Sequence, residues 1–330
     1  MKSPARLALT AVPLAFLLAL LVAPALRLLA EGGHVSWWEP VQDSYLRWRL
    51  AWSTAQAALT CLAALALGLP VAWVLARFEF AGRALVIHAL MLPFVVPTLV
   101  AAMGVLALLG PHGVISAQLG LDLQGGPWLL IYGNLFFNLC LVVRSATEAL
   151  GQVSASRVAA ARTLGATPWR VFWRVEWPAI TPWLMSALCL VFLYCFSGFG
   201  LALVLGGQEY ATAEVEIYSL VAHELQLAQA GALALWVLGI TALVALAYAL
   251  VERRLATPSR ADVVARRAPQ GWRQWASVVV ALAVLALFCA APLVAIVWRA
   301  AAAGFSAWAV LWAEPTLLAL WNSLRFTVLA

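Results

Sequence analysis

The chain contains little charge for its length. Only 10% of its 330 residues are charged, whereas 65% are hydrophobic. A soluble domain of this size could not bury so much apolar surface. The net charge of +6 does not indicate nucleic-acid binding, because arginines also gather in the cytoplasmic loops of membrane proteins. The composition therefore predicts an all-α polytopic membrane protein with no nucleic-acid partner.

The sequence also lacks the motifs of catalytic and metal sites. It contains no G-x-x-x-x-G-K-[ST], no H-E-x-x-H and no G-x-S-x-G. Its four histidines are scattered, and its five cysteines lie inside apolar runs without paired spacing, so we expect neither metal ligands nor disulfides. Nearly all charges fall outside the apolar runs, whereas ion-coupled transporters and intramembrane enzymes need ionisable groups within the bundle. We therefore expect a non-catalytic chain that carries no cofactor and depends on a separate ATPase.

Apolar runs predict about seven membrane spans and a truncated eighth. A span needs roughly 20 apolar residues, and the eighth run, which begins near Leu317, is shorter. The first run could belong to a cleaved signal peptide, but its length favours an uncleaved helix. The seven predicted spans cover about residues 7–26, 53–76, 84–109, 128–143, 180–205, 230–251 and 276–298.

The distribution of charge predicts the orientation of these spans. If the N-terminus is cytoplasmic and the spans alternate, the inner segments hold 15 of the 20 Lys and Arg residues and the outer segments hold four. The acidic residues have the opposite bias, with five inside and nine outside. Basic residues are expected to accumulate on the cytoplasmic side. We therefore predict a cytoplasmic N-terminus and a cytoplasmic loop between the fourth and fifth spans.

Two short stretches predict an internal duplication. Trp52-Ser53 and Trp321-Asn322-Ser323 each stand at the entry to an apolar run. Duplicated halves are common in transporters, and a second copy of the second-to-sixth span unit would give a chain of about 520 residues. The present sequence would then be a fragment or a truncated reading frame. We expect an N-terminal helix and outer loop at 1–52, a first membrane unit at 53–251, a linker at 252–275 and the start of a second unit at 276–330.

Prolines and asparagines within the spans are candidates for a transport path. Pro93 and Pro97 free backbone carbonyls, so the third span must be kinked or broken. A broken helix that lines the path and a kinked packing helix are both compatible with this pattern. Asn134 and Asn138 lie four apart on one face of the fourth span. They could face the path, although hydrogen bonding between helices is the favoured interpretation.

The segment from Glu148 to Pro178 is the one long polar interruption in the middle of the chain. Gly165 can end a first short helix, and Thr167 with Pro168 can begin a second one. The pattern therefore predicts two short helices joined by a turn. Docking to a partner protein and binding to the membrane surface are both compatible with the residues alone. Four arginines lie within 18 residues of this segment: Arg157, Arg162, Arg170 and Arg174.

This segment resembles the EAA loop of permease subunits in bacterial binding-protein-dependent ABC importers. The pattern is Glu-Ala-Ala, three residues, Gly, nine residues and Ile-x-Leu-Pro. Ala160, Ala161, Gly165, Val175 and Pro178 occupy matching positions, whereas Ala159 replaces the Glu and Trp177 replaces the Leu. The resemblance implies a type I importer permease fold and an ATPase-coupling loop that docks on ATP-binding subunits, which bind the ATP and Mg²⁺. Its coupling residues would be Ala159, Ala160, Ala161, Arg162, Gly165 and Pro178.

A narrower resemblance, to the permeases of thiamine importers and of the related iron(III) importers, covers most of residues 40–251. It rests on VQDSYLRW, LFFNLCLVVRSATEAL, LGATPWRVFWRVEWPAI and LVLGGQEYATAEVEIY. It implies import of thiamine and its phosphates through the bacterial inner membrane, in contact with membrane lipid. The implied partners are two ATP-binding subunits and a periplasmic substrate-binding protein. An iron(III) permease is the alternative within the family, and an ion-coupled secondary transporter is the alternative outside it.

Overall fold

The computed structural model describes residues 37–120, 123, 126–255, 265–304 and 308–329, together with scattered positions between 11 and 27. Most of this described part is helical, as predicted, and it includes two π-helical turns, η1 and η2, and a 3₁₀ turn, η3. The elements are α2 (Glu39–Gln42), α3 (Ser44–Arg77), α4 (Arg83–Ala89), α5 (Leu92–Val95), α6 (Thr98–Leu109), α7 (Val114–Leu119), α8 (Trp128–Gly151), α9 (Ala155–Thr163), α10 (Pro168–Val171), η1 (Phe172–Glu176), α11 (Trp177–Phe196), α12 (Phe199–Leu205), α13 (Ala213–Ala222), α14 (Leu227–Leu255), α15 (Gly271–Leu285), η2 (Ala286–Ala290), α16 (Ala291–Ala302), η3 (Ala309–Trp312) and α18 (Glu314–Leu329).

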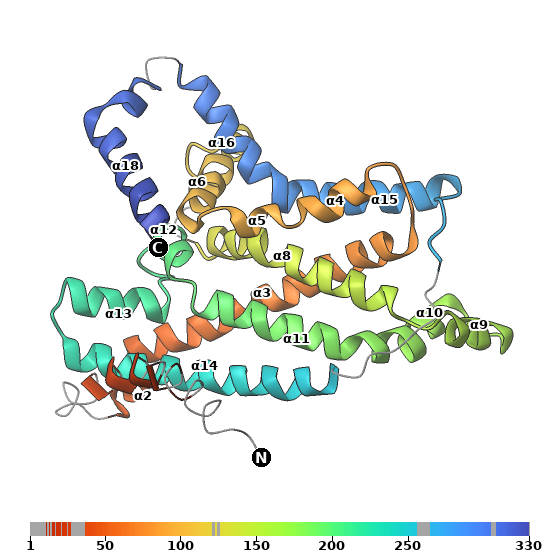
Figure 1. Ribbon diagram of the computed structural model, residues 1–330, viewed down its shortest axis with the longest axis horizontal. Coiled ribbons are helices and arrows are strands. Elements are labelled where there is room, and N and C mark those ends of the chain that lie inside the picture. Colours follow the sequence, from red (N-terminus) through yellow and green to blue (C-terminus); the bar gives the residue numbers. More distant parts are fainter. Residues whose placement is uncertain are drawn as a thin grey trace.

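Four long helices form the centre of the molecule. α3 packs along α8 and α11, and α11 packs in turn against α14. In Figure 1 these helices run side by side, with α9 and α10 at one end and α2 and α13 at the other. Leu75, Leu139 and Ile180 are fully buried where α3, α8 and α11 meet. The apolar runs therefore produce a helical bundle with its polar segments at the ends.

Six helical segments in the described part of the chain are long and apolar enough to cross a membrane. They correspond to the second to seventh predicted spans, whereas only scattered positions of the predicted first span are among the described residues. Residues 256–264 of the predicted linker also lie outside them. The predicted truncated eighth run forms α18, which has no buried residues. The candidate spans are Ser44–Arg77, Thr98–Leu119, Trp128–Gly151, Pro168–Phe196, Leu227–Arg253 and Gly271–Ala302.

The predicted third span, expected to be kinked or broken at its prolines, is interrupted twice. α4, α5 and α6 follow one another, and Val96 between α5 and α6 has the extended backbone that a residue before proline favours. Pro97 then stands at the N-cap of α6, where its missing N–H disturbs no helical hydrogen bond. Of the two interpretations of these prolines, the broken helix is the observed geometry.

The predicted fifth span and two predicted outer loops also differ from the structure. The helix over 180–205 is interrupted at Ser197 and Gly198, which separate α11 from α12. The predicted loop at 110–127 contains α7, and the predicted loop at 206–229 contains α13. The polar composition located these loops, but glutamates and alanines also favour helix, and packing against α14 and α3 stabilises α13.

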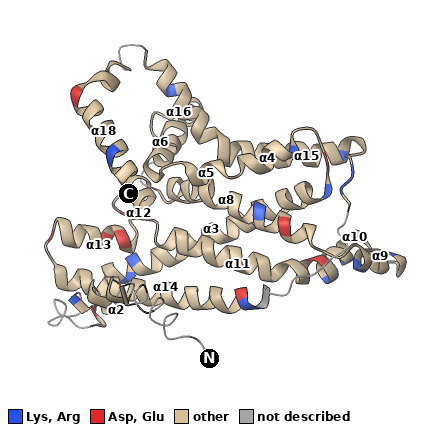
Figure 2. Ribbon diagram, in the orientation of Figure 1, with Lys and Arg blue, Asp and Glu red and all other residues tan. Residues whose placement is uncertain are grey.

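Charged side chains occur mainly toward the two ends of the bundle. Figure 2 shows long uncharged stretches along α11 and α14, with arginines concentrated near α9 and α10. Two arginines are nevertheless buried in the described part, Arg49 near the start of α3 and Arg83 at the start of α4. Each is held by specific acceptors, as a buried charge requires.

Candidate functional site

The predicted first helix of the polar loop is α9. Ser154 begins it, because the Ser154 hydroxyl accepts a hydrogen bond from the Arg157 N–H at 3.4 Å. At the other end, the Ala166 N–H donates to the Ala161 carbonyl at 3.0 Å and the Gly165 N–H donates to the Arg162 carbonyl at 2.9 Å. This pair of bonds is the Schellman arrangement, and Gly165 has the left-handed φ of +78° that it requires. The predicted helix stop at Gly165 is confirmed.

The second predicted helix of the loop is α10. The Thr167 hydroxyl accepts a hydrogen bond from the Arg170 N–H at 3.4 Å, and Pro168 occupies the first helical position. The predicted pair of short helices is therefore confirmed. The chain then passes through the π-helical turn η1 into α11. Trp169 and Trp173 are in edge-to-face contact, with their ring centroids 5.5 Å apart.

The helix pair formed by α9 and α10 packs against the bundle on one side and is exposed on the other. Val158 and Val171 are buried against the bundle. In contrast, Leu164 is 87% exposed and Trp169 is 71% exposed. Exposed large apolar side chains at a loop tip mark a surface that contacts a partner or a membrane. Among the predicted coupling residues, Ala161 is half-buried, and the exposed ones are Ala159, Ala160, Arg162, Gly165 and Pro178.

An ion pair connects this loop to the bundle. The Arg77 guanidinium, at the end of α3, contacts the Glu176 carboxylate, at the end of η1. Glu176 is only 2% exposed, and its Oε2 atom has no hydrogen-bond partner within the described residues. Because removing one partner of a buried pair is costly, α3 and the loop are expected to move together. Glu176 was not among the predicted site residues, although its position within the apolar stretch VEWP could have indicated a buried charge.

A cavity of about 450 Å³ lies where the broken helices meet. The breaks between α5 and α6 and between α11 and α12 face α8 across it. Phe94 and Thr98 line it from either side of the first break, whereas Pro93 and Pro97 are not among its lining residues. Its other aromatic lining residues are Phe137, Tyr194 and Phe199, and its other polar lining residues are Asn134, Asn138 and Ser197.

The two predicted asparagines both line this cavity and join helices. The Asn134 amide donates to the Gln56 side-chain carbonyl of α3 at 2.8 Å. The Gln56 amide donates in turn to the Cys195 carbonyl of α11 at 2.8 Å. Asn138 donates to the Asn134 carbonyl at 2.9 Å, and its Oδ1 atom has no partner in the described part of the chain. The favoured interpretation, hydrogen bonding between helices, is observed for both residues, because the Asn138 amide also donates to the Cys195 sulfur of α11 at 3.3 Å. Among the described residues, the Asn138 Oδ1 atom remains a free acceptor beside the cavity.

A second polar network lies at the opposite end of α3. The Arg49 guanidinium contacts the Glu216 carboxylate of α13 at 3.1 Å and the Tyr45 hydroxyl at 2.6 Å. It also donates to the Gln208 carbonyl at 2.9 Å and the Glu209 carbonyl at 2.8 Å. A wide cavity of about 920 Å³ borders this network. These bonds fix the loop before α13 on the bundle.

A stripe of buried polar residues that was not predicted from the sequence runs along α3. Four buried polar residues follow helical spacing, so they lie on one face of the helix. The predicted boundary of this span, at residue 53, placed Arg49 in a loop and hid the periodicity. The spacing of these residues, by four, three and four positions, could have indicated the stripe. The stripe consists of Arg49, Ser53, Gln56 and Thr60.

Comparison with protein families gives one match that covers more than half of the chain. The family model described as the binding-protein-dependent transport system inner membrane component matches residues 62–257. A transporter of known structure, a bacterial ABC transporter that imports the acidic polysaccharide alginate, has a chain of the same fold. That chain superposes with a TM-score of 0.61 and 18% sequence identity, covering 77% of this chain and 96% of its own length.

Curated relatives carry several substrate names. The thiamine transport system permease protein of Escherichia coli (strain K12) is 31% identical over 239 residues, which is 70% of this chain and 43% of the relative. Its counterpart in Brucella abortus (strain 2308) is 34% identical over 235 residues, 66% of this chain and 43% of the relative. A sulfate permease of Synechocystis is 31% identical over 206 residues, 60% of this chain and 74% of the relative.

The chain thus spans less than half the length of the thiamine permeases that it matches. The family match does not depend on this difference, because it covers most of the central bundle, the polar loop and the two helix breaks that border the cavity. The chain belongs to the family of binding-protein-dependent transport system inner membrane components, the non-catalytic permease subunits of ABC importers.

Proposed function

We propose that the chain forms part of an ATP-driven importer that moves thiamine and its phosphates into the cytoplasm. The observation that carries this proposal is the connection between an exposed loop and a cavity. The loop helices expose Leu164 and Trp169, and the Arg77–Glu176 pair ties them to α3. α3 also holds Gln56, which hydrogen-bonds Asn134 at the wall of the cavity. A force on the loop would therefore reach the cavity through one helix.

The cavity chemistry favours an aromatic organic cation over a bare metal ion. Among the described residues, its lining includes four aromatic rings and, besides Tyr194, four side-chain amides or hydroxyls, but no carboxylate, thiol or imidazole. Aromatic faces attract cations such as a thiazolium ring. The free Asn138 Oδ1 atom can accept a hydrogen bond from an exocyclic amine. The thiamine permeases among the relatives support the same substrate.

The two ends of the bundle suit two partners. Cytoplasmic ATP-binding subunits would dock on α9 and α10, with Ala160 close to the contact. A periplasmic substrate-binding protein would dock at the opposite end, near α2 and α13. A related alginate transporter has been solved together with its substrate-bound periplasmic protein. In this proposal the protein lies in the bacterial inner membrane with a cytoplasmic N-terminus, and the charge bias of the loops supports that orientation.

Uptake of labelled thiamine tests the substrate and the energy source. The complete transport system that contains this chain is expressed in bacteria that lack their own thiamine importer. We expect uptake that unlabelled thiamine phosphate inhibits and that stops when the ATP-binding subunit is inactivated. Iron(III) uptake without thiamine uptake would mean that the substrate is iron(III) and not thiamine. Uptake that collapses only with an uncoupler would mean that an ion gradient, and not ATP, drives transport.

Crosslinking tests the docking surface. Ala160→Cys, on the exposed face of α9, should crosslink to an ATP-binding subunit in membranes. Tyr218→Cys, at the opposite end on α13, is a control that should not. Crosslinking of the α9 cysteine to lipid probes alone would mean that this helix lies on the membrane surface instead.

A further inference from the structure

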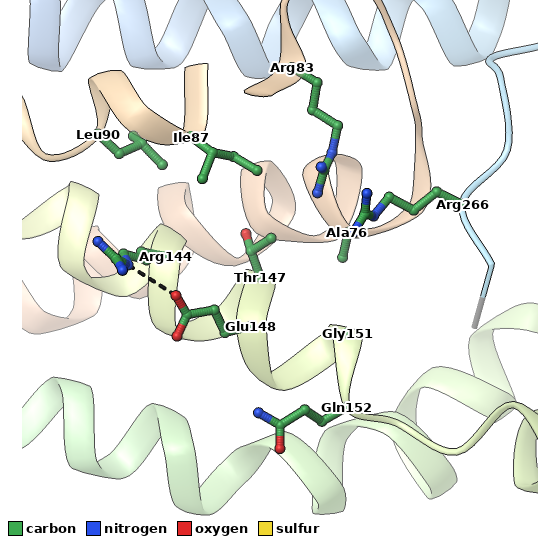
Figure 3. Close-up of a pocket in the computed structure, with 10 residues that line it drawn as sticks. All are labelled: Ala76, Arg83, Ile87, Leu90, Arg144, Thr147, Glu148, Gly151, Gln152 and Arg266. Carbon is green, nitrogen blue, oxygen red and sulfur yellow. Dashed lines mark hydrogen bonds and ion pairs between the residues drawn. The ribbon is translucent and has the colours of Figure 1, made fainter. Parts of the chain in front are cut away.

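A cavity of about 440 Å³ lies beside the start of the polar loop. It is separate from the cavity lined by Phe94 and Asn134. It is bounded by the end of α3, by α4 and by the last turns of α8. Figure 3 shows Arg83 and Arg266 reaching from one wall toward Thr147 and Glu148 on the other. The residues that matter for its chemistry are Arg83, Arg144, Thr147, Glu148, Gln152 and Arg266.

Backbone hydrogen bonds fix Arg266 beside this cavity. The next residue, Arg267, is tied to the segment that follows α3 by two backbone hydrogen bonds. The Glu79 N–H donates to the Arg267 carbonyl at 3.0 Å, and the Arg267 N–H donates to the Arg77 carbonyl at 3.2 Å. This is the parallel bridge between Phe78 and Arg267. The C-terminal part of the predicted linker therefore contributes an arginine to a wall built mainly from residues of the predicted first unit.

The wall formed by Arg83 and Arg266 has more positive than negative charge. A single carboxylate, Glu79, contacts both arginines, at 3.0 Å from Arg266 and 3.8 Å from Arg83. The Arg83 Nε atom already donates a hydrogen bond to the Leu75 carbonyl at 2.8 Å. Burial lowers the pKa of the Arg83 guanidinium from its usual value, and the nearby Arg266 charge lowers it further, against the effect of Glu79. An anion between the two arginines would relieve this repulsion.

The facing wall is close to neutral and offers the Gln152 amide as a further donor. The Arg144 Nε atom donates to the Glu148 carboxylate at 3.0 Å, so these two charges offset each other. The Thr147 hydroxyl already donates a hydrogen bond to the Val143 carbonyl at 2.7 Å. The exposed Gln152 side chain can present its amide to a ligand. The cavity as a whole therefore has a net positive charge.

We propose that this cavity binds a phosphate group, held between Arg83 and Arg266. Arginine guanidinium groups bind phosphate oxygens through paired, charge-assisted hydrogen bonds. The group could belong to a soluble phosphate compound or to the headgroup of an anionic lipid, because both present the same oxygens. This inference concerns a site outside the transport path and does not depend on which solute is imported.

The position of the site connects it to the polar loop. Gln152 and Gly151 line the cavity, and Ser154, two residues further, caps α9. A bound phosphate would thus restrain the backbone that leads directly into the first loop helix. We expect occupancy to reduce hydrogen exchange of the amides at the start of α9.

Binding to the purified chain in detergent micelles tests the proposal with two probes. The soluble probe is inorganic pyrophosphate, measured by calorimetry. The lipid probe is phosphatidic acid, counted by native mass spectrometry against phosphatidylcholine. Arg266→Gln should weaken binding about tenfold or more, since a charged hydrogen bond contributes about 1.5–3 kcal/mol. Arg83→Gln should act similarly, and Glu79→Gln should strengthen binding because it removes the competing carboxylate.

Arg253→Gln is the matched control, because Arg253 is an exposed arginine near the end of α14 that does not line the cavity. Arg266 has a half-exposed side chain, 48% accessible, so its substitution tests the site without disturbing a buried residue. Pyrophosphate binding that Arg266→Gln weakens identifies a soluble ligand, and phosphatidic acid retention with the same sensitivity identifies a lipid. No binding of either probe, or binding that Arg266→Gln and Arg253→Gln change equally, would overturn the proposal.

Discussion

Replacing Arg49 by methionine should destabilise the bundle strongly. Arg49 and Glu216 are buried, with side chains 6% and 5% exposed. The substitution removes the ion pair and the hydrogen bonds to the Gln208 and Glu209 carbonyls, which lie 2.9 and 2.8 Å from the guanidinium. It also leaves the Glu216 carboxylate buried, with the Tyr45 hydroxyl, 2.8 Å away, as its only remaining donor in the described part of the chain. Removing one member of a buried pair costs about 3–5 kcal/mol.

Two further variants separate the ion pair from the loop contacts. Glu216→Gln keeps a side chain that can bond Tyr45 and leaves Arg49 bonded to the loop carbonyls. We expect it to lower the free energy of unfolding by about 1.5–3 kcal/mol, the value of a charged hydrogen bond. In the double variant Arg49→Met with Glu216→Gln, the loss should be smaller than the sum of the single losses, because the residues share one network.

Equilibrium unfolding in mixed detergent micelles measures these differences. Arg47→Met is the matched control, since Arg47 lies on the same helix but is exposed, with one long bond of 3.3 Å to the Val41 carbonyl. A surface substitution of this kind changes stability by about 0.5 kcal/mol or less. If Arg49→Met cost no more than Arg47→Met, the network would not hold α13 on the bundle. A Glu216→Gln loss larger than the Arg49→Met loss would contradict the argument from the loop carbonyls.

Three other substitutions test the polar loop, the cavity at the helix breaks and helix α13. Gly165→Val should abolish uptake while the chain still inserts, because a side chain at φ +78° costs about 1–2 kcal/mol; Gly239→Val, where an added Cβ meets nothing within 4 Å, should leave uptake unchanged. Gly200→Val should raise KM for uptake, since its Cβ would lie 2.9 Å from the Thr98 hydroxyl at the cavity; unchanged KM would contradict the assigned path. Burial raises the pKa of the Glu214 carboxyl above its ordinary value of 4.5. The stability that the protonated Glu214 contributes is therefore fully present below pH 4.5 and is lost as the pH rises through the folded-state pKa. Glu214→Gln should remove this decline, and an unaltered pH profile of unfolding would count against it.

Local patterns predicted the polar loop well. Gly165, Thr167 and Pro168 each act within a few residues of their own position, so their effect on the backbone is local. The observed α9 and α10 accordingly match the prediction. The docking role assigned to Ala159 and its neighbours stays a prediction, because it depends on a surface of another protein.

Local patterns were less informative about the cavity. Pro93 and Pro97 correctly indicated an interruption, but their neighbours Phe94 and Thr98 line the space. Asn134 was visible in the sequence, whereas its partner Gln56 lies 78 positions away along the chain. Only the packing of α3 against α8 brings these two amides together.

The sequence by itself determined that this chain is a helical membrane protein with a two-helix polar loop. Hydrophobic runs, charge bias and helix caps express free energies of residues in their own short segment, so they can be read without a partner. The tertiary structure decided which buried polar groups pair and where cavities open. The Arg49–Glu216, Gln56–Asn134 and Arg77–Glu176 contacts join helices distant in sequence. A buried polar group needs a partner wherever packing supplies one, and that choice depends on the whole bundle.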